Sequence, residues 1–355
     1  MTETIKTLGI LGGGQLGRMS AQAAQKLGIR TVIFTPEQDS PASQVADETI
    51  VAAYDDRAAL EKFSKIVDVI SYEFENIPVE TVEYLTKLKP VYPEKRTLEV
   101  SQDRISEKTF LNSIGIATAR WELAQNTKNV DEILKKWGKS ECILKTARFG
   151  YDGKGQAKYK TGDDLDATWR KLKSGRVIVE DIVDFASEIS VIVGRDRFEK
   201  IVTYGPMHNE HRHHILHKTT FPAPIAADVA AQSIAIATNL AQQINLRGVI
   251  TLEMFVTRDG KILANEIAPR THNSGHWTID ACAVSQFEQH VRTVCGLPAA
   301  DPACTTPAEM LNLIGDDIDK IGEYEDKTGT FIHLYGKQES RPGRKMGHIT
   351  TLKTK

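Results

Sequence analysis

The sequence predicts a protein of mixed class, with an α/β unit at the N-terminus, a larger α+β unit after it and a small β-rich unit at the end. Over residues 1–100, short apolar strands alternate with helical patterns, as in a parallel sheet with crossover helices. Over residues 101–297, longer strands with alternating apolar residues and short turns indicate antiparallel pairing. The stretch 298–355 holds three short strand candidates.

Composition supports several domains and excludes some partners. A chain of 355 residues exceeds one ordinary core. The net charge of −2 gives no reason to expect a nucleic-acid partner. The sequence shows no signal peptide and no apolar run that approaches the roughly 18 residues of a membrane span. The four cysteines form no Cys-x-x-Cys pair, so we expect a reduced, cytoplasmic protein without a membrane partner.

The first unit opens with a strand, a glycine turn and a helix. Gly12, Gly14 and Gly17 fit G-x-G-x-x-G in the context used for dinucleotide binding, where pyrophosphate lies at the helix N-terminus. A nicotinamide-dependent dehydrogenase is therefore one alternative. The acid expected about 20 residues on would be Glu37, which lies past Pro36 rather than at the end of the next strand. A tight turn without a ligand and a site for another phosphate are the other interpretations.

The alternation continues to the end of the first unit. Asp55 or Asp56 is expected to cap one helix, and Pro78 to stand at the first position of the next. The expected strands are "RTVIF", "ETIVA" and "VDVISYEFENI", and the expected helices are "YDDRAALEKFSKIV" and "PVETVEYLTKL".

The middle unit contains a second glycine-rich stretch. "ECILKTA" and "GQAKYK" read as the two arms of a hairpin that flanks glycines 150, 153 and 155. These glycines suit a close approach to phosphate, yet the P-loop pattern, with Gly-Lys followed by Ser or Thr, is absent. Further antiparallel strands, a long helix near 226–246 and a hairpin with Asp259-Gly260 at its turn follow.

Two glutamates face each other across that last hairpin. Pairing outward from Asp259-Gly260 places Glu253 opposite Glu266, with Cβ atoms about 5 Å apart. Two carboxylates that close repel each other unless a cation lies between them or one is protonated. Together with the amide oxygen of Asn265 they suit magnesium. The alternative is a pair of exposed glutamates on a solvated sheet face.

Polar residues follow directly after this pair. Arg270, His272, Asn273 and His276 offer donors and a proton carrier, which suits a small anion bound beside a phosphate. Five more histidines lie in "HNEHRHHILH". Zinc is one interpretation of these, but their spacing is irregular and no cysteine is near, so a polar loop with one or two ligand contacts is favoured.

Six motifs occur in an order that resembles a known family. They are "GGGQLGRM", "YEFENIP", "GYDGKGQ", "EIAPRTHNSGHWT", "MLNLIG" and "RPGRKMGH". With Lys145, Glu188 and the glutamate pair, they resemble the ATP-grasp superfamily, and within it the synthetases that make N5-carboxyaminoimidazole ribonucleotide in bacterial purine synthesis. The resemblance covers nearly the whole chain.

This resemblance implies an ATP-grasp fold, in which two lobes clamp ATP between antiparallel sheets. It implies an N-terminal parallel-sheet (pre-ATP-grasp) domain over 1–100, an ATP-grasp domain over 101–297 with a lid subdomain at about 122–182, and a small C-terminal β-rich domain over 298–355. The implied reaction uses ATP, Mg²⁺, bicarbonate and 5-aminoimidazole ribonucleotide. Bicarbonate attacks the γ-phosphate to give carboxyphosphate, and the exocyclic amine is then carboxylated. A homodimer formed through the N-terminal domain is also implied.

The resemblance also implies roles for individual residues. The nucleotide would be bound by Arg104, Lys145, the lid residues Gly150, Tyr151, Asp152, Gly153, Lys154, Gly155 and Gln156, the adenine hinge Glu180, Asp181, Ile182 and Val183, and by Glu188, His211, Asn265 and Glu266. The metal would be held by Glu253 and Glu266. The ribonucleotide would be surrounded by Gln15, Glu73, Tyr151, Asp152, Arg341, Arg344 and Lys345. The catalytic group would be Asp152, Lys154, Arg270, His272, Asn273 and Lys345. The N-terminal glycines would then lie against the ribose phosphate of the ribonucleotide.

Two alternatives to this reaction stay open at the level of sequence. Another ATP-grasp ligase, such as a glycinamide ribonucleotide transformylase or a biotin carboxylase, would share the glutamate pair but not "HNSGHW" with "RPGRKMGH". A regulatory nucleotide-binding protein without turnover would not need so many reactive polar groups.

Overall fold

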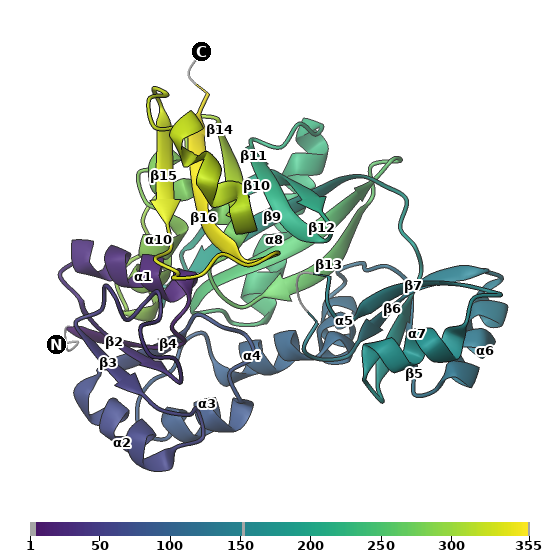
Figure 1. The fold of residues 1–355 in the computed structure, drawn as a ribbon, viewed down its shortest axis with the longest axis horizontal. Helices are drawn as coiled ribbons and strands as arrows, with labels where there is room; N and C mark the ends of the chain where they lie inside the picture. Colours follow the sequence, from purple (N-terminus) through teal and green to yellow (C-terminus); the bar gives the residue numbers. More distant parts are fainter. Residues whose placement is uncertain (1–4, 151–152, 354–355) are drawn as a thin grey trace.

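The computed structural model describes residues 5–150 and 153–353, and the fold is given for these (Figure 1). The N-terminal unit and a small sheet at the opposite end of the molecule are connected by two helices, and the largest sheet rises between them (Figure 1). The connecting helices are α4 (Lys95–Gln102) and α5 (Arg104–Ser113). Between them Asp103 caps α5 by accepting hydrogen bonds from the backbone N–H groups of Ile105 and Ser106.

The N-terminal unit is a four-stranded parallel sheet, as predicted, in the order β3-β2-β1-β4. Its buried strands are apolar on both faces because helices cover both of them. Leu16 and Met19 of the first helix pack on one face, and Leu60 and Phe63 of the second pack on the other. Asp56 caps the second helix through the backbone N–H of Ala59. The elements are β1 (Thr7–Leu11), α1 (Gln15–Lys26), β2 (Arg30–Thr35), β3 (Glu48–Val51), α2 (Arg57–Ile66), β4 (Val69–Tyr72) and α3 (Val79–Thr86).

The largest sheet has eight antiparallel strands in the order β13-β12-β9-β10-β11-β14-β16-β15. The long helix α8 (Ala227–Gln243) packs against β9 and β12, while α10 (Gln286–Val294) lies between this sheet and α1. The strands are β9 (Phe185–Arg195), β10 (Ile201–Arg212), β11 (Ile215–Phe221), β12 (Gly248–Thr257), β13 (Ile262–Ala268), β14 (Ala308–Ile314), β15 (Thr330–Leu334) and β16 (Lys345–Leu352). A short helix, α9 (Thr278–Ala281), and 3₁₀ turns at Asn273–Gly275 and Gly315–Glu323 complete this part.

The three strands of the tail do not form a separate sheet. β14 pairs with β11 from Phe221–Ala308 to Lys218–Leu311, so the tail extends the central sheet. The strand candidates were predicted correctly, but their partner could not be, because sheet pairing between distant segments leaves no local pattern in the sequence.

The third sheet has four antiparallel strands in the order β5-β8-β6-β7, and it lies in the stretch that was predicted as the lid subdomain, a name that is kept for it below. The predicted hairpin that flanks the glycines is β6–β7, with Glu141 opposite Lys160 and Lys145 opposite Gln156. Two helices cover one face and enclose a core that includes Trp137. The elements are β5 (Trp121–Ala124), α6 (Thr127–Trp137), β6 (Glu141–Thr146), β7 (Gln156–Lys160), α7 (Leu165–Leu172) and β8 (Val177–Glu180).

The β12–β13 hairpin confirms the predicted pairing of Glu253 with Glu266, although both its turn and its strand register differ from the prediction. Its loop is not the predicted two-residue turn: Thr257 pairs with Lys261, and the left-handed Gly260 (φ 80°) ends a three-residue loop. The register then shifts between Glu253 and Met254, because Asn265 is an extra residue on β13. Glu253 and Glu266 are therefore directly opposite each other, as the simple count had predicted.

The cysteines depart from the expectation of a fully reduced protein. Cys282, just after α9, forms a disulfide with Cys304 in the segment before β14. Cys142 and Cys295 are free and buried. The absence of a Cys-x-x-Cys motif was misleading, since the fold brings two cysteines that are 22 residues apart to a Cα separation of 4.2 Å. In the described part of the chain, no helix combines the length and apolar character that crossing a membrane requires.

Candidate active site

The predicted carboxylate pair lies where the central sheet meets α5 and the lid subdomain. Glu266 accepts a hydrogen bond from Nη1 of Arg104 at 3.0 Å, and Oε1 of Glu253 lies 2.9 Å from Nε2 of His272. Burial alone would raise the pKa of Glu253, but His272, His211 and Lys345 more than offset it and hold that pKa at about 2. Glu253 is therefore ionised at neutral pH.

The two carboxylates fit a magnesium ion by position and by donor type. They come from paired positions on adjacent strands, and Asn265, which offers another hard oxygen donor, directly precedes Glu266 in the chain. The side chain of Glu266 is 40% exposed and that of Glu253 is 15% exposed, so the pair is open on one side. Carboxylate and amide oxygens are the ligands that Mg²⁺ prefers in proteins.

Behind this pair lies a buried cluster of lysines and a glutamate. Glu180, at the end of β8, makes ion pairs with Lys145 of β6 and with Lys108 of α5. Lys145 also donates to Oδ1 of Asn265 at 3.3 Å. Burial alone would raise the pKa of Glu180, yet the two lysines hold it at about 2. The predicted hinge residue Glu180 and the predicted phosphate ligand Lys145 are thus in direct contact.

Two members of this region were missed by the sequence reasoning. Lys108 is completely buried, and Glu107 beside it accepts a hydrogen bond from the backbone N–H of Ile267. Burial raises the pKa of Glu107 to about 7, against the opposing charge of Arg104. The sequence did contain a signal for them. Glu107 and Lys108 stand three and four residues after Arg104, so on a helix they share one face with that predicted residue.

Of the remaining predicted nucleotide residues, Glu188 and His211 form a close hydrogen-bonded pair across β9 and β10. Burial alone would lower the pKa of His211, but Glu188 raises it. Asp181 makes a more exposed ion pair with Lys139 at 3.2 Å. Glu253 and Glu266 also raise the pKa of His211, which indicates that the pair of Glu188 and His211 lies near the carboxylate pair.

The glycines of the β6–β7 hairpin require their backbone freedom at two positions. Gly153 and Gly155 have φ of 78° and 71°, which side chains disfavour. A Cβ at Gly155 would lie 2.5 Å from Oγ1 of Thr146, and one at Gly153 would lie 2.5 Å from Cβ of His214. Tyr151 and Asp152 lie outside the described residues.

We expect Gly155→Ala to raise the KM for ATP by roughly tenfold with a smaller change in kcat, because it displaces a proposed phosphate-binding loop. Gly162→Ala is the matched control: its φ of 103° is also positive, but a Cβ there meets nothing within 4 Å. Steady-state kinetics on both variants make the comparison. Equal KM values for ATP in the two would show that this loop does not contact the nucleotide.

The N-terminal glycine turn is occupied by the protein's own carboxylate. Glu73, which follows β4, accepts hydrogen bonds from the backbone N–H groups of Gly14 at 2.8 Å and Gly17 at 3.1 Å. A Cβ at Gly12 would lie 2.6 Å from Glu73. The helix N-terminus that would attract a phosphate therefore already holds a negative group. This disagrees with the dinucleotide interpretation, while the placing of these glycines against the ribose phosphate of the ribonucleotide stays a prediction.

The predicted anion-binding residues divide into two groups. Arg270 is only 16% exposed and donates from Nε to Glu75 and from Nη1 to the carbonyl of Thr271 at 3.0 Å. Together with His272 it lies beside the carboxylates. Asn273 is directed elsewhere: its amide exchanges two hydrogen bonds with the amide of Asn312 on β14, at 2.9 and 2.7 Å.

The predicted C-terminal residues border the N-terminal unit. Lys345 begins β16, Arg344 donates to the carbonyl of Glu339, and Arg341 pairs with the Glu339 carboxylate. Lys337, which the sequence reasoning missed, donates to the carbonyl of Lys345 at 2.7 Å. Burial, with Arg344 and Lys345 nearby, lowers the pKa of Lys337 to about 8, and Glu73 acts on it from across the boundary. Glu73, which follows β4, therefore approaches these cations from the N-terminal side, and Gln15 is the first residue of α1 in the same unit.

A zinc site in "HNEHRHHILH" is not supported by the geometry. Among the residues that the structure describes, the group that could hold a metal through three such side chains is instead Asp280, His333 and His348. There His333 hydrogen-bonds Asp280 at 2.9 Å, and its ring stacks on His348 with centroids 4.5 Å apart. The histidines of the loop make separate contacts, such as Gln156 with His214.

His276 and His348 are completely buried, and both contact the hydroxyl of Tyr335. Burial lowers the pKa of each well below 6.5, so both are neutral in the folded protein. The unfolded chain takes up protons as the pH falls through about 6.5, and the folded chain does not. We therefore expect the free energy of unfolding, measured with urea, to fall between pH 7.5 and pH 5.5. His348→Gln should lose less over that range, and an equal loss in variant and parent would contradict this origin.

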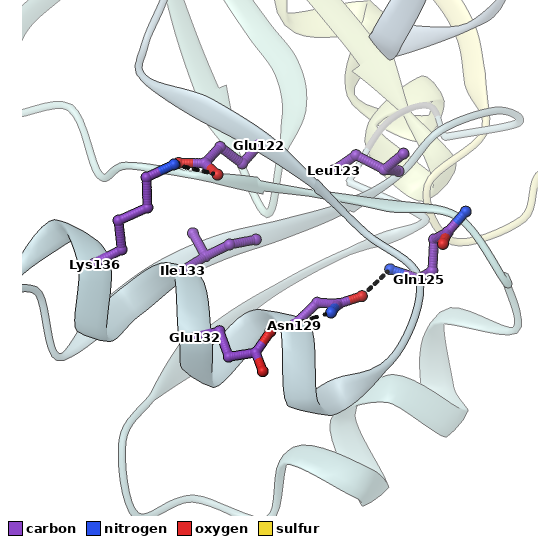
Figure 2. Close-up of a pocket in the computed structure, with 7 residues that line it drawn as sticks. All are labelled: Glu122, Leu123, Gln125, Asn129, Glu132, Ile133 and Lys136. Carbon is purple, nitrogen blue, oxygen red and sulfur yellow. Dashed lines mark hydrogen bonds and ion pairs between the residues drawn. The ribbon is translucent and has the colours of Figure 1, made fainter.

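A groove of 390 Å³ lies on the lid subdomain, apart from all of these residues (Figure 2). Its polar groups are paired with one another: Lys136 with Glu122 at 2.9 Å, and the backbone N–H of Gln125 with Asn129 at 3.2 Å. Figure 2 shows Glu122 on β5, Asn129 and Lys136 on α6, and Gln125 in the connection between these two elements. This groove therefore offers few unpaired polar groups to a ligand and does not coincide with the candidate site, which is defined by its charged residues.

Comparisons with known proteins agree with this geometry. Three family models match in order: a ribonucleotide synthetase preATP-grasp domain over residues 5–102, an ATP-grasp domain over 109–287 and a phosphoribosylaminoimidazole carboxylase C-terminal domain over 308–355. The N5-carboxyaminoimidazole ribonucleotide synthase of Brucella melitensis is 45% identical over 98% of this chain and 96% of its own. That of Bacillus subtilis is 39% identical over 98% and 91%.

Solved structures give the same result. An ADP complex of an N5-carboxyaminoimidazole ribonucleotide synthetase matches with a TM-score of 0.94 at 39% identity, over 99% of this chain and 94% of that one. An Aspergillus clavatus synthase with ADP and 5-aminoimidazole ribonucleotide matches with a TM-score of 0.92 at 27% identity, over 99% and 94%. The predicted fold class is confirmed, while the domain boundaries at 100 and 297 stay predictions.

Proposed function

The chain belongs to the N5-carboxyaminoimidazole ribonucleotide synthase family and is an ATP-dependent ligase of purine biosynthesis, and we propose how its residues carry out the reaction. One observation carries the proposal. The glutamate pair contacts Arg104 on one side and His272 on the other. Residues suited to ATP phosphates and residues suited to a small anion therefore meet at the same two carboxylates.

In the first step, ATP lies between the central sheet and the lid subdomain. Arg104 and Lys145 contact its phosphates, residues 180–183 contact adenine, and Glu188 with His211 contacts the ribose. Glu253 and Glu266 would hold Mg²⁺, which when bound would neutralise negative charge on the phosphates. The lid glycines cover the phosphates with backbone N–H groups and exclude water.

In the second step, Arg270 and His272 hold bicarbonate. A bicarbonate oxygen attacks the γ-phosphorus, the bond from that phosphorus to the β-phosphate oxygen breaks, and ADP leaves. The product is carboxyphosphate, which hydrolyses readily and therefore has to be shielded from water. The guanidinium of Arg270 is fixed by Glu75 and the carbonyl of Thr271, and its remaining N–H groups are available to the anion.

In the third step, the exocyclic amine of 5-aminoimidazole ribonucleotide attacks the carboxyphosphate carbon. The carbon–nitrogen bond forms, the bond from that carbon to the phosphate oxygen breaks, and the leaving inorganic phosphate takes up the proton that the amine gives up. The ribonucleotide lies between Glu73 of the N-terminal unit and the cations Lys337, Arg344 and Lys345, which suit its phosphate. Gln15 and Arg341 border the same space, and Tyr151, Asp152 and Lys154 would approach from the lid.

The proposal includes bicarbonate as the carboxyl donor, magnesium as the metal, a homodimer and a cytoplasmic location, each from the family resemblance. The experiment that tests the reaction is phosphate release from ATP, with bicarbonate and the ribonucleotide omitted in turn. We expect rapid release only when both are present. Full release with glycinamide ribonucleotide and formate instead would identify a different ligase of the same fold.

A further inference from the structure

Lys108 has no role in the steps above, yet it is among the most deeply buried charged groups of the described chain. It lies on α5 with no exposed surface, and its ammonium contacts Oε1 of Glu180, which is itself 4% exposed. It also donates to the backbone carbonyl of Asn265 at 3.3 Å. One lysine therefore connects α5, the end of β8 and the strand that carries Glu266.

Lys145 competes for the same carboxylate. Its ammonium lies 2.5 Å from Oε2 of Glu180, so the two lysines take one oxygen each. If Lys145 were the only cation near Glu180, their charges would cancel, and a phosphate would meet a neutral pair instead of a cation. With Lys108 present, the three groups together carry one positive charge. Lys145 is the lysine that keeps some exposure, 10% against 0% for Lys108, and that reaches the side-chain oxygen of Asn265.

We propose that Lys108 is a positioning residue for nucleotide binding: it neutralises Glu180, and so leaves the charge of Lys145 for the phosphates of ATP. This inference rests on the proposed contact of Lys145 with phosphate. A lysine that only filled space would affect the binding affinity of every ligand of this site alike. A charge-balancing role affects the phosphates and spares the nucleoside.

The test compares affinities for ADP and for adenosine by calorimetry, with competition for the weaker ligand. Lys108→Met should lower ADP affinity by about tenfold or more while changing adenosine affinity little, as expected when one partner of a buried charge pair is removed. Lys139→Met is the matched control, because it removes the same charge from the exposed pair with Asp181 next to Glu180. It should leave the ratio of the two affinities unchanged.

The double variant Lys108→Met/Glu180→Gln decides between charge and packing. Removing both charges frees Lys145 again, so ADP affinity relative to adenosine should return to within about threefold of the parent. If Lys108→Met alone fails to fold, this neutral pair is expected to fold and still gives the ratio. A double variant with a reduced ratio overturns the proposal, as does a single variant that loses both ligands equally.

Lys145→Met separates this inference from the function on which it rests. If it lowers ADP affinity and spares adenosine while Lys108→Met does not, only the role of Lys108 is wrong. If Lys145→Met itself leaves the ratio unchanged, the phosphate contact in the proposed function is wrong.

Discussion

Glu266→Gln is expected to lower turnover by about 100-fold or more, which is typical for the loss of a charge that stabilises phosphoryl transfer. The substitution keeps the shape of the side chain but removes the charge that pairs with Arg104 and that would hold the metal. Glu253→Gln should cause comparable damage, since it removes the charged partner of His272. The measurement is phosphate release at rising magnesium concentration, with ADP affinity determined in parallel.

Glu210→Gln is the matched control for this prediction. Glu210 is also an ion-paired glutamate on a strand of the central sheet, and its exposure of 43% is close to that of Glu266, but its cross-strand partner is Lys218 and not a second carboxylate. It should keep nearly full turnover, because it belongs to no carboxylate pair that could hold a metal. If Glu266→Gln or Glu253→Gln retains near-normal rates at saturating magnesium, the pair does not hold the metal.

Arg270→Ala should abolish bicarbonate-dependent ATP cleavage, with a loss on the order of 100-fold or more, because the attacking anion is no longer held against the γ-phosphate. Arg270 is held on two sides in the structure, by Glu75 and by the carbonyl of Thr271, so its orientation is fixed before an anion binds. Arg270→Lys should recover little activity, since an ammonium cannot serve Glu75, Thr271 and an anion with the same planar geometry. The readout is phosphate release with and without bicarbonate.

Arg258→Ala is the matched control for Arg270→Ala. It removes an arginine that is 72% exposed and paired with Asp184, and it should behave like the parent. Two results for Arg270→Ala would show that its assignment is wrong. Bicarbonate stimulation of normal size in Arg270→Ala would show that another residue holds the anion. A loss of ADP affinity in Arg270→Ala that equals its loss of turnover would assign the arginine to the nucleotide instead.

The fold was largely predictable because its signals are local. Alternation of strands and helices gave the N-terminal sheet, and period-two strands gave the antiparallel sheets. Pairing between distant segments was not predictable, so the junction of β11 with β14 and the Cys282–Cys304 bond were missed. Both depend on contacts that no short stretch of sequence encodes.

The candidate site was predicted where a motif or a strand register specifies it, as with Glu253 and Glu266. It was missed where a residue acts through its neighbours. Lys108 and Glu107 stand on a helix whose sequence shows ordinary amphipathic charges, and only the packing reveals that they are buried. Glu73 was placed with the ribonucleotide, while its hydrogen bonds to the glycine turn depend on the spacing between two parallel strands.

The joining of β14 to β11 also has a consequence for synthesis of the chain on the ribosome. Phe221 leaves the ribosome well before Ala308, with α8, the β12–β13 hairpin and α10 made in between. During that interval β11 presents an unpaired edge, which can pair with a neighbouring nascent chain. Because β16 then adds to β14 and carries Lys345, the event that covers this edge also brings in a residue that we propose to act in catalysis. Protection from aggregation and the gain of activity should therefore coincide as translation of this segment is completed.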